Sequence, residues 1–454
     1  MDLCDFIIEH ENDDLSSLVL HRDRWPGIDA GLAAECIASR RKLRFKVPEW
    51  YADPAIICPF SLSAEQCSST ATAAYKAAIA TGGAYRSRKF FERASCVAVA
   101  ERTVPPPSRK FFGRASCVAV AERTASPPSQ KALRVADLTG GLGVDCWQFS
   151  KVATAVLYNE MNPVLAEAAK ANLERLGCDN IEFSGICISA ETLPALLDSF
   201  EPDLVFADPA RRVEGRKVFL PEDCSPDILT LQDMILDRGC CMLVKLSPMA
   251  DISLMLRKFH CVKELHVVEA DGECKELLLL MEPGFDGECT LVAVNASRSV
   301  PPDSTGDIRF TISEEKAAEP SFISREPEPG QLLFEPGAAL SKSGAFNLIS
   351  ARFGLEKLGK DAHLYLSSGI HPELEGLGKF FEILETAPFG KPALRDFATR
   401  WPDADVTARA LPINSKALQE KLKSGSKKKQ NSDSHIHIFG VGTFIGRLLI
   451  AASR

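Results

Sequence analysis

The pattern of apolar and polar positions changes character twice along the chain. Up to residue 80, apolar residues recur every three to four positions, and an Ala-rich stretch at 63–80 starts with Ser and ends at a Gly-Gly pair. This pattern predicts helices. From residue 132, short apolar runs alternate with amphipathic stretches, which predicts alternating strands and helices. Such alternation is typical of a parallel sheet covered by helices on both faces.

The predicted sheet consists of five short strands and a final hairpin. In chain order the strands are LRVADLT, ATAVLYNE, IEFSGIC, DLVFADP and CMLVKLSP. The hairpin joins ELHVVEA to KELLLLME through an Asp-Gly turn at 271–272. The hairpin should therefore place one antiparallel strand in an otherwise parallel sheet.

Beyond residue 290 the chain is rich in Pro and Glu, and strand–helix–strand patterns then resume. The last 60 residues predict a βαββ unit, with strand VTARALP, helix NSKALQEKLK and strands HIHIFG and RLLIAA. We therefore divide the chain into five parts: an N-terminal helical segment (1–87), an insertion (88–129), a strand–helix domain (130–284), a linker with a small α+β region (285–385) and a basic module (386–454).

The insertion is an internal duplication. Residues 88–108 recur as 109–129, with 18 of 21 positions identical. Two copies are too few for a solenoid, and each copy ends in a Pro-rich break that stops a helix or strand. We interpret it as a disordered surface loop rather than a functional arm, because long loops cost little closure entropy.

The overall composition is that of a globular protein, but charge is distributed unevenly along the chain. The chain is 45% hydrophobic and 25% charged, as in globular proteins, and its formal net charge is −8. Residues 391–454 hold 12 Lys/Arg and 5 Asp/Glu, so they are basic and the rest of the chain is acidic. The net negative charge argues against a generally nucleic-acid-coated surface, and the basic C-terminal residues are compatible with a basic binding module.

Three features of the sequence indicate where in the cell the protein is located. The acidic N-terminus does not resemble a signal peptide, and no apolar run approaches the ~20 residues of a membrane span. The 15 cysteines include no Cys-x-x-Cys pair, so reduced core thiols are expected. We predict a cytoplasmic protein without a membrane partner.

A glycine-rich turn follows the first predicted strand. It reads Asp137-Leu-Thr-Gly140-Gly141-Leu-Gly143, and Glu160 closes the second strand 20 residues beyond Gly140. Glycines let the backbone approach a ligand, a helix start supplies unpaired N–H groups, and a carboxylate at this distance is typical of ribose binding. Asp137 would repel the pyrophosphate of a dinucleotide, which disfavours a dehydrogenase. A carboxylate there suits a ligand with an ammonium group, such as S-adenosylmethionine.

The segments ADLTGGLGVD, ADPARR, VKLSP and GECKEL resemble class I S-adenosylmethionine-dependent methyltransferases, and specifically a bacterial family with a C-terminal THUMP-like domain. The class I resemblance covers about 132–282. It implies an α/β fold with a Rossmann-like methyltransferase sheet, an N-terminal helical segment and a C-terminal α+β THUMP-like module. It also implies a methionine site formed by Asp137, Gly140, Gly141 and Gly143, with Glu160 on the ribose. Where an Asp often reads adenine, this chain has Cys187-Ile188-Ser189.

Asp208-Pro209-Ala210-Arg211 ends the fourth strand. In amino-methyltransferases of nucleic acids this segment is usually Asp/Asn-Pro-Pro and an aromatic, which hold and stack on a base with an exocyclic amine. Asp208 and the carbonyl of Pro209 fit that role, whereas Ala210 and Arg211 depart from it. Arg211 or Arg212 would stack on a base or clamp a phosphate; alternatively, both are solvated.

A second interpretation uses Lys76, Asp208, Lys245 and Glu269, which resemble the tetrad of ribose 2′-O-methyltransferases. Lys245 and Glu269 end the fifth and sixth strands, and Lys76 precedes Asp137 by 19 residues once the 42-residue insertion is left out. In such a tetrad a deprotonated lysine activates the hydroxyl. The alternative is that Lys76 lies on a helix surface.

The C-terminal lysines suggest the partner. Lys427, Lys428 and Lys429, with Lys421 and Lys423, would neutralise phosphates, unless they form a solvated loop. His435 and His437 lack a third ligand, so no metal is expected. The sequence therefore predicts a methyltransferase that modifies RNA, with a base exocyclic amine favoured over a ribose hydroxyl. A non-catalytic RNA- or protein-binding relative remains the alternative from another class.

Overall fold

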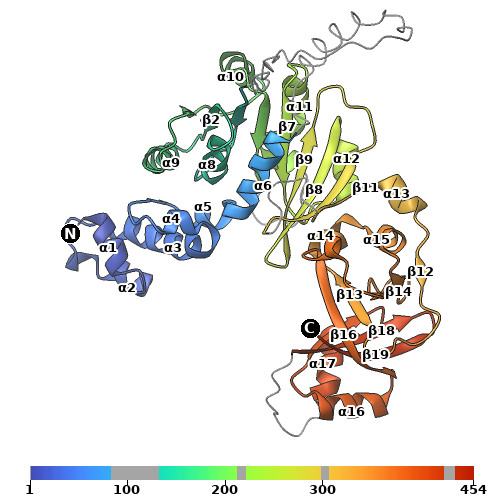
Figure 1. The fold of residues 1–454 in the computed structure, drawn as a ribbon. Coiled ribbons are helices and arrows are strands. Elements are labelled where there is room, and N and C mark those ends of the chain that lie inside the picture. Colours follow the sequence, from blue (N-terminus) through green and yellow to red (C-terminus); the bar gives the residue numbers. More distant parts are fainter. Residues whose placement is uncertain (1, 83–131, 212–220, 298–305, 424–434) are drawn as a thin grey trace, which may run out of the picture.

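The computed structural model describes residues 2–82, 132–211, 221–297, 306–423 and 435–454 (Figure 1). The predicted insertion at 88–129 lies outside these residues. N-terminal helices, a central strand–helix domain and a C-terminal domain follow one another along the chain (Figure 1). Within the described ranges, no helix is both long and apolar enough to cross a membrane.

The N-terminal segment is helical, as predicted. Its elements are α1 (Leu3–Glu9), α2 (Leu15–Leu20), η1 (Arg22–Arg24), α3 (Ala30–Lys46), α4 (Pro48–Tyr51), α5 (Ser61–Gln66) and α6 (Thr70–Thr81). The single helix predicted at 63–80 is divided into α5 and α6. The reason is a capping box, in which Ser69 and Thr72 each accept the other's backbone N–H and start a new helix.

The central sheet has nine strands in the order β11-β10-β8-β9-β7-β4-β1-β2-β3. The strands that correspond to the sequence prediction are β1 (Arg134–Asp137), β2 (Ala155–Asn159), β3 (Ile181–Ser184), β4 (Leu204–Ala207), β7 (Cys241–Leu246), β8 (Val262–Ala270) and β9 (Glu273–Met281). Strands β3, β2, β1, β4 and β7 pair in parallel. Strand β9 runs antiparallel between β7 and β8, which confirms the predicted final hairpin.

The central domain extends further than predicted. Strand β10 (Thr290–Asn295) pairs in parallel with β8, and β11 (Ile308–Thr311) pairs antiparallel with β10. The boundary expected at residue 284 is therefore too early. The apolar run TLVAVN follows the hairpin after a short turn, and its four buried residues complete the sheet rather than a linker.

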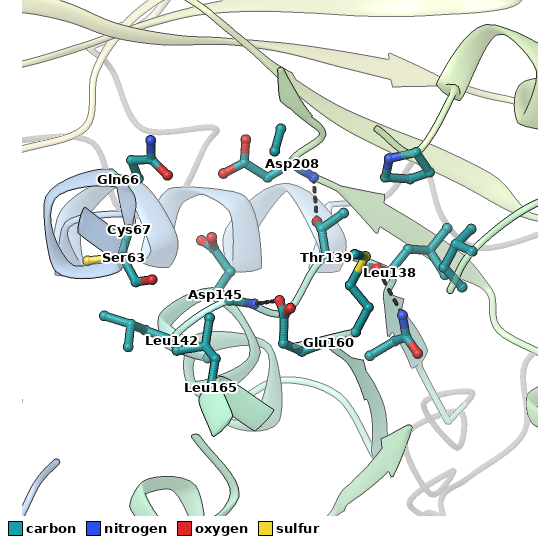
Figure 2. Close-up of a pocket in the computed structure, with 18 of the residues that line it drawn as sticks. Ser63, Gln66, Cys67, Leu138, Thr139, Leu142, Asp145, Glu160, Leu165 and Asp208 are labelled. Atoms are coloured by element: carbon teal, nitrogen blue, oxygen red, sulfur yellow. Dashed lines mark hydrogen bonds between the residues drawn. The ribbon is translucent and has the colours of Figure 1, made fainter. Parts of the chain in front are cut away.

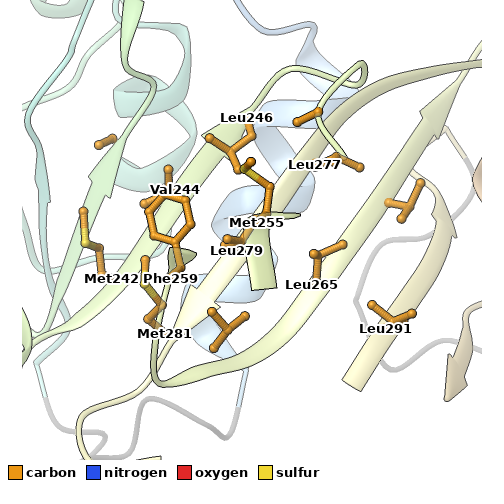
Figure 3. Packing of buried hydrophobic residues seen from close by; sticks show 14 of the residues in the cluster. Met242, Val244, Leu246, Met255, Phe259, Leu265, Leu277, Leu279, Met281 and Leu291 are labelled. Atoms are coloured by element: carbon orange, nitrogen blue, oxygen red, sulfur yellow. The ribbon is translucent and has the colours of Figure 1, made fainter. Parts of the chain in front are cut away.

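Helices cover both faces of this sheet. Helices α6, α8 (Val144–Ser150) and α9 (Pro163–Arg175) share one hydrophobic cluster with the sheet. The opposite face packs against α10 (Leu193–Phe200), α11 (Ile228–Leu236) and α12 (Ile252–Lys258). Strand β9 shows the alternation: Leu277, Leu279 and Met281 face the second group of helices (Figure 3), and Leu278 and Leu280 face the first.

The C-terminal domain is built on one eight-stranded sheet, in the order β12-β14-β15-β13-β16-β19-β18-β17. The strands are β12 (Ser321–Phe322), β13 (Leu332–Pro336), β14 (Glu356–Lys357), β15 (Tyr365–Ser367), β16 (Gly378–Pro388), β17 (Asp405–Arg409), β18 (Ile436–Thr443) and β19 (Gly446–Ser453). The other described helices are η3 (Pro221–Asp223), α13 (Ile312–Ala317), α14 (Ala338–Ser343), α15 (Phe346–Phe353), η4 (Pro372–Leu374), α16 (Lys391–Arg400) and α17 (Ser415–Lys423).

The predicted βαββ unit is present as β17, α17, β18 and β19, but it is not a separate module. Strand β16 pairs with β13 on one side and β19 on the other. The expected boundary at 385/386 therefore cuts through a strand, and hydrogen bonding across β16 joins both predicted parts into one domain.

A buried carboxylate links the two sheet domains. Glu269, on β8, accepts a hydrogen bond from the backbone N–H of Ala339 at the start of α14, at 2.8 Å. A side chain at Gly337 would collide with this carboxylate, since its Cβ would lie 2.7 Å from Oε2. Helix α14 also contributes Ala339 and Leu340 to the core beneath the central sheet. Glu269 therefore holds the C-terminal domain against the central one.

Replacing Glu269 by Ala should lower the free energy of unfolding by about 1–3 kcal/mol, because the buried N–H of Ala339 loses its acceptor. Glu269→Gln, which keeps an acceptor oxygen, should cost less. Chemical denaturation measures both. Glu273→Ala, at an exposed position on the same hairpin, is the matched control and should change stability by less than ~0.5 kcal/mol. Equal stability of Glu269→Ala and the wild-type protein would contradict this role.

Candidate active site

A pocket opens at the carboxyl ends of β1, β2 and β4, where ligands bind in open α/β sheets (Figure 2). The loop at 138–145 forms its floor, and residues 159–161 and 186–188 form one side. Asp208 and Ala210 lie at the end of β4. The N-terminal segment supplies a further wall, which the sequence did not predict.

The glycine-rich loop is fixed by close contact with β2. A Cβ at Gly140 would lie 2.2 Å from the ring of Tyr158, so only glycine fits there. Gly143 adopts φ +87° at the start of α8, a conformation that favours glycine. The hydroxyl of Tyr158 donates a hydrogen bond to the carbonyl of Gly141 at 2.6 Å. These contacts explain the glycine spacing and hold the loop in place.

The N–H groups of the three loop glycines are engaged within the protein. Gly140 N donates to the carbonyl of Asn159 at 2.8 Å, and Gly143 N donates to that of Gly140 at 2.8 Å. Gly141 N donates to the Glu160 carboxylate at 3.1 Å. These three hydrogen bonds shape the loop. The unpaired N–H groups were expected at the helix start, and there the N–H groups of Val144 and Asp145, in the pocket wall, have no hydrogen-bond acceptor among the described residues.

Glu160 lies in the pocket wall at the end of β2 (Figure 2). Its Oε2 accepts the Gly141 N–H, and its Oε1 accepts the N–H of Asn162 at 2.8 Å. Each carboxylate oxygen has further acceptor capacity. Two backbone hydrogen bonds therefore orient Glu160 towards a ligand without saturating it.

Asp137 lies behind the pocket rather than in its wall. Its carboxylate is 1% exposed and accepts hydrogen bonds from Thr139 N at 2.9 Å and from the Cys146 thiol at 3.2 Å. Burial, with the nearby carboxylate of Asp145, raises the pKa of Asp137 to about 7. The expected contact of Asp137 with a ligand's ammonium group does not fit this placement. Asp145, which was not predicted, lines the pocket instead.

Asp145 belongs to a buried cluster of charged groups. The ammonium of Lys76, which is fully buried, donates to Glu276 Oε1 at 2.9 Å and to the Ser68 hydroxyl at 2.9 Å. The same Nζ lies 3.2 Å from Asp145 Oδ1, and Ser68 donates to Asp145 Oδ2 at 2.8 Å. Lys76 therefore has three polar partners, which exclude the surface position that we considered.

Asp208 and Lys245 form the adjacent ion pair. Lys245 Nζ lies 2.5 Å from Asp208 Oδ2, and Asp208 N donates to the Thr139 hydroxyl at 2.7 Å. Burial alone would lower the pKa of Lys245, but the carboxylates of Asp208, Glu276 and Asp145 outweigh it and raise the pKa above its ordinary value. Lys245 is therefore held as an ammonium.

Only three members of the expected tetrad come together. Lys76, Asp208 and Lys245 meet, whereas Glu269 binds α14 on the opposite face of the sheet. Glu276 on β9 supplies the fourth group. Lys245 pairs with Leu278 across the strands, which puts Glu276 two residues along on the same face. A lone acidic residue before the apolar run LLLLM was the sequence signal for this position.

The remaining residues predicted for the site differ in whether the structure describes them and in whether they line the pocket. Pro209 is described but is not among the residues that line the pocket, and of Arg211 only the backbone is described. Arg212, Lys427, Lys428 and Lys429 lie outside the described residues. Cys187 and Ile188, at the position where an Asp often reads adenine, lie in the pocket wall. His437 hydrogen-bonds to Thr407 at 2.8 Å, and the described residues hold no group of three side chains suited to a metal.

One solved structure resembles this chain over its whole length. A candidate methyltransferase from Porphyromonas gingivalis W83 is 25% identical and superposes with a TM-score of 0.73, covering 100% of this chain and 97% of that one. The likeness therefore includes the helical, central and C-terminal parts. The family model for a ferredoxin-like domain matches residues 332–374. That match lies in the C-terminal domain, and the expected THUMP-like module is not confirmed by it.

Other matches are partial. An rRNA methylase from Streptococcus thermophilus is 16% identical, with a TM-score of 0.25, over 34% of this chain and 87% of that one. A candidate methyltransferase from Streptococcus mutans in complex with SAH is 15% identical, with a TM-score of 0.25, over 34% and 89%. None of the curated proteins matches the chain in sequence.

Asp137 should make stability depend on pH. Its carboxyl ionises near 3.8 when unperturbed and near 7 in the folded protein, so the folded state binds the proton more tightly. The wild-type protein should therefore lose stability as pH rises from about 4 to about 7. Asn cannot ionise, so Asp137→Asn should raise Tm relative to the wild-type protein by ~2–6 °C more at pH 8 than at pH 5, as measured by scanning fluorimetry. A difference independent of pH would contradict the raised pKa.

Proposed function

We propose that this protein is an S-adenosylmethionine-dependent methyltransferase that modifies an exocyclic amine of an RNA base. The observation that carries the proposal is the arrangement of carboxylates in one pocket, with Glu160 on one side, Asp145 near the loop and Asp208 at the end of β4. The whole-length similarity to a candidate methyltransferase supports it.

The pocket wall suits each part of this ligand. Glu160, oriented by two backbone N–H groups, would accept hydrogen bonds from the ribose diol. Apolar Met161, Ile186 and Ile188 lie on the same side and would contact adenine. Asp145, held by Ser68 and Lys76, would accept the ammonium group of the methionine part. S-adenosylmethionine supplies a methyl group on a sulfonium, which methyl acceptors attack.

The charge balance also suits a cation. The cluster contains the carboxylates of Asp145, Asp208 and Glu276 and the ammonium groups of Lys76 and Lys245. It therefore carries one formal negative charge in excess. S-adenosylmethionine has a sulfonium, an ammonium and a carboxylate, so its net positive charge complements the cluster.

Asp208 would orient the acceptor amine. Its carboxylate accepts a hydrogen bond from the amine, which leaves the nitrogen lone pair directed at the methyl group. The amine needs no prior deprotonation, because its lone pair is already available. After transfer, the extra proton on nitrogen leaves to water by way of Asp208. Thr139 and Lys245 fix Asp208 for this task.

A ribose hydroxyl is the second candidate acceptor, with Lys76, Asp208, Lys245 and Glu276 as the tetrad. The clustering of these four side chains favours it. That mechanism needs a neutral lysine as base. Three carboxylates raise the pKa of Lys245, which disfavours the neutral form and therefore favours the amine.

RNA is proposed as the substrate because of charge. Residues 391–454 carry 12 basic and 5 acidic residues beside an otherwise acidic chain, which suits contacts to phosphates. A cytoplasmic location accords with such a substrate. The missing aromatic after Asp208-Pro209 leaves the non-catalytic relative as the alternative. An absence of methyl transfer would favour that alternative.

Cofactor orientation can be tested with three ligands: S-adenosylmethionine, S-adenosylhomocysteine and 5′-methylthioadenosine, which lacks the amino-acid part. Glu160→Ala should weaken all three by about 1.5–3 kcal/mol, because a charged hydrogen-bond acceptor is lost. Asp145→Asn should weaken only the first two, since 5′-methylthioadenosine has no ammonium. Titration calorimetry measures the affinities. Equal losses for all three ligands in Asp145→Asn would remove Asp145 from the ammonium site.

The acceptor chemistry can be tested by labelled-methyl transfer to total RNA from cells that lack this protein, followed by nucleoside mass spectrometry. If a base amine is the acceptor, Asp208→Ala should abolish turnover and Lys245→Met should reduce it modestly, with rates nearly constant from pH 7 to 9. If ribose is the acceptor, Lys245→Met should lose ~10²–10⁴-fold, and wild-type activity should rise with pH as the lysine loses its proton.

Both variants must retain S-adenosylmethionine affinity for the comparison to report on catalysis. A Lys245→Met protein with wild-type affinity and no turnover would overturn the preference for the amine. Methyl groups recovered on a 2′-oxygen would do the same.

A further inference from the structure

The N-terminal segment forms one wall of the proposed active site. Ser63 and Gln66 of α5, followed by Cys67 and Ser68, line the same pocket as Asp208. Ser68 is already engaged by Lys76 and Asp145. Gln66, at the end of α5, lies on the side of the pocket where Asp208 lies (Figure 2). Nothing in the proposed cofactor site uses this glutamine.

Helix α5 is short but firmly held by α3. Ser61 N donates to the Glu35 carboxylate at 2.7 Å, and Lys42 Nζ donates to the carbonyl of Ser61 at 3.0 Å. Lys42 also binds the Glu65 carboxylate at 2.8 Å. At the other end, Lys46 donates to the carbonyl of Glu65. Both ends of α5 are therefore anchored, which gives Gln66 a fixed position.

The amide of Gln66 has no hydrogen-bond partner among the described residues, and its side chain is exposed to the pocket. The other amide in the pocket wall differs. Asn159 donates to the carbonyls of Leu138 and Ile186, at 3.2 and 3.0 Å, and accepts the N–H of Ile186 at 2.9 Å. Asn159 is therefore fully used in holding two loops together, whereas Gln66 can bind a ligand.

We infer that Gln66 determines which base is accepted, by binding the edge where an amine adjoins a ring nitrogen. A primary amide donates through Nε2 and accepts through Oε1 in one plane. On their Watson–Crick edges adenine and cytosine offer the complement, an amine donor beside a ring-nitrogen acceptor, whereas guanine presents its amine beside the N1–H donor and uracil has no amine. Asp208 would accept the second hydrogen of that amine. This inference rests on the proposed function and adds a specificity-determining residue from the N-terminal segment.

The test compares Gln66→Ala and Gln66→Glu with the wild-type protein on total RNA from cells that lack it. Gln66→Ala should lower kcat/KM for RNA by ~10–100-fold, the range of one bidentate base contact. Gln66→Glu should lower it at least as much, because a carboxylate cannot donate to the ring nitrogen. Affinity for S-adenosylmethionine should not change in either variant. Leu62→Ala, an exposed residue of α5 outside the pocket wall, is the matched control and should behave as wild type.

Nucleoside mass spectrometry should place the methyl on the amine of adenine or cytosine and thereby distinguish the two. Unchanged kcat/KM in Gln66→Ala would overturn the inference, as would an equal loss in Leu62→Ala or a loss of S-adenosylmethionine affinity in Gln66→Ala. A wild-type protein that binds S-adenosylmethionine but methylates no adenine or cytosine would also overturn it. Failure of the wild-type protein to bind S-adenosylmethionine would instead refute the proposed function.

Discussion

The arrangement of the active site depends on the compensation of one buried charge. The ammonium of Lys76 is fully removed from water, which costs several kcal/mol unless partners replace the solvent. Glu276, Ser68 and Asp145 provide them. Since these partners come from β9, the N-terminal segment and α8, one ion cluster ties the helical segment, the sheet and the pocket wall together. The position of Asp145 in the pocket follows from it.

The same cluster links structure to chemistry. Three carboxylates around two lysines keep Lys245 protonated and leave one negative charge in excess. A site of this kind favours a cationic ligand and acceptors that need no base. Asp208 is fixed by Lys245 and Thr139, while the amide of Gln66 is free to contact an acceptor. Orientation, rather than proton abstraction, is therefore the task to which these side chains are suited.

Local sequence rules predicted most of the central domain. The strand–helix alternation, the Asp271–Gly272 hairpin and the glycine turn each depend on neighbours in the chain, so their patterns could be recognised directly. Domain boundaries were less predictable. From the sequence, β10 and β16 were placed in a linker and in small units. Their hydrogen bonding to strands distant in sequence shows which sheet each belongs to.

The sequence by itself determined the loop that contacts Tyr158 and the placement of Glu160 after β2, because both depend on steric fit and spacing within one βαβ unit. Only the tertiary structure shows that Asp145, and not Asp137, lines the pocket, and that Glu276, and not Glu269, binds Lys76. In each pair both residues are acidic and close in sequence, and the face of the element decides which one reaches the pocket cluster. The wall formed by α5 likewise depends on packing between segments separated by about 70 residues or more, which no local pattern records.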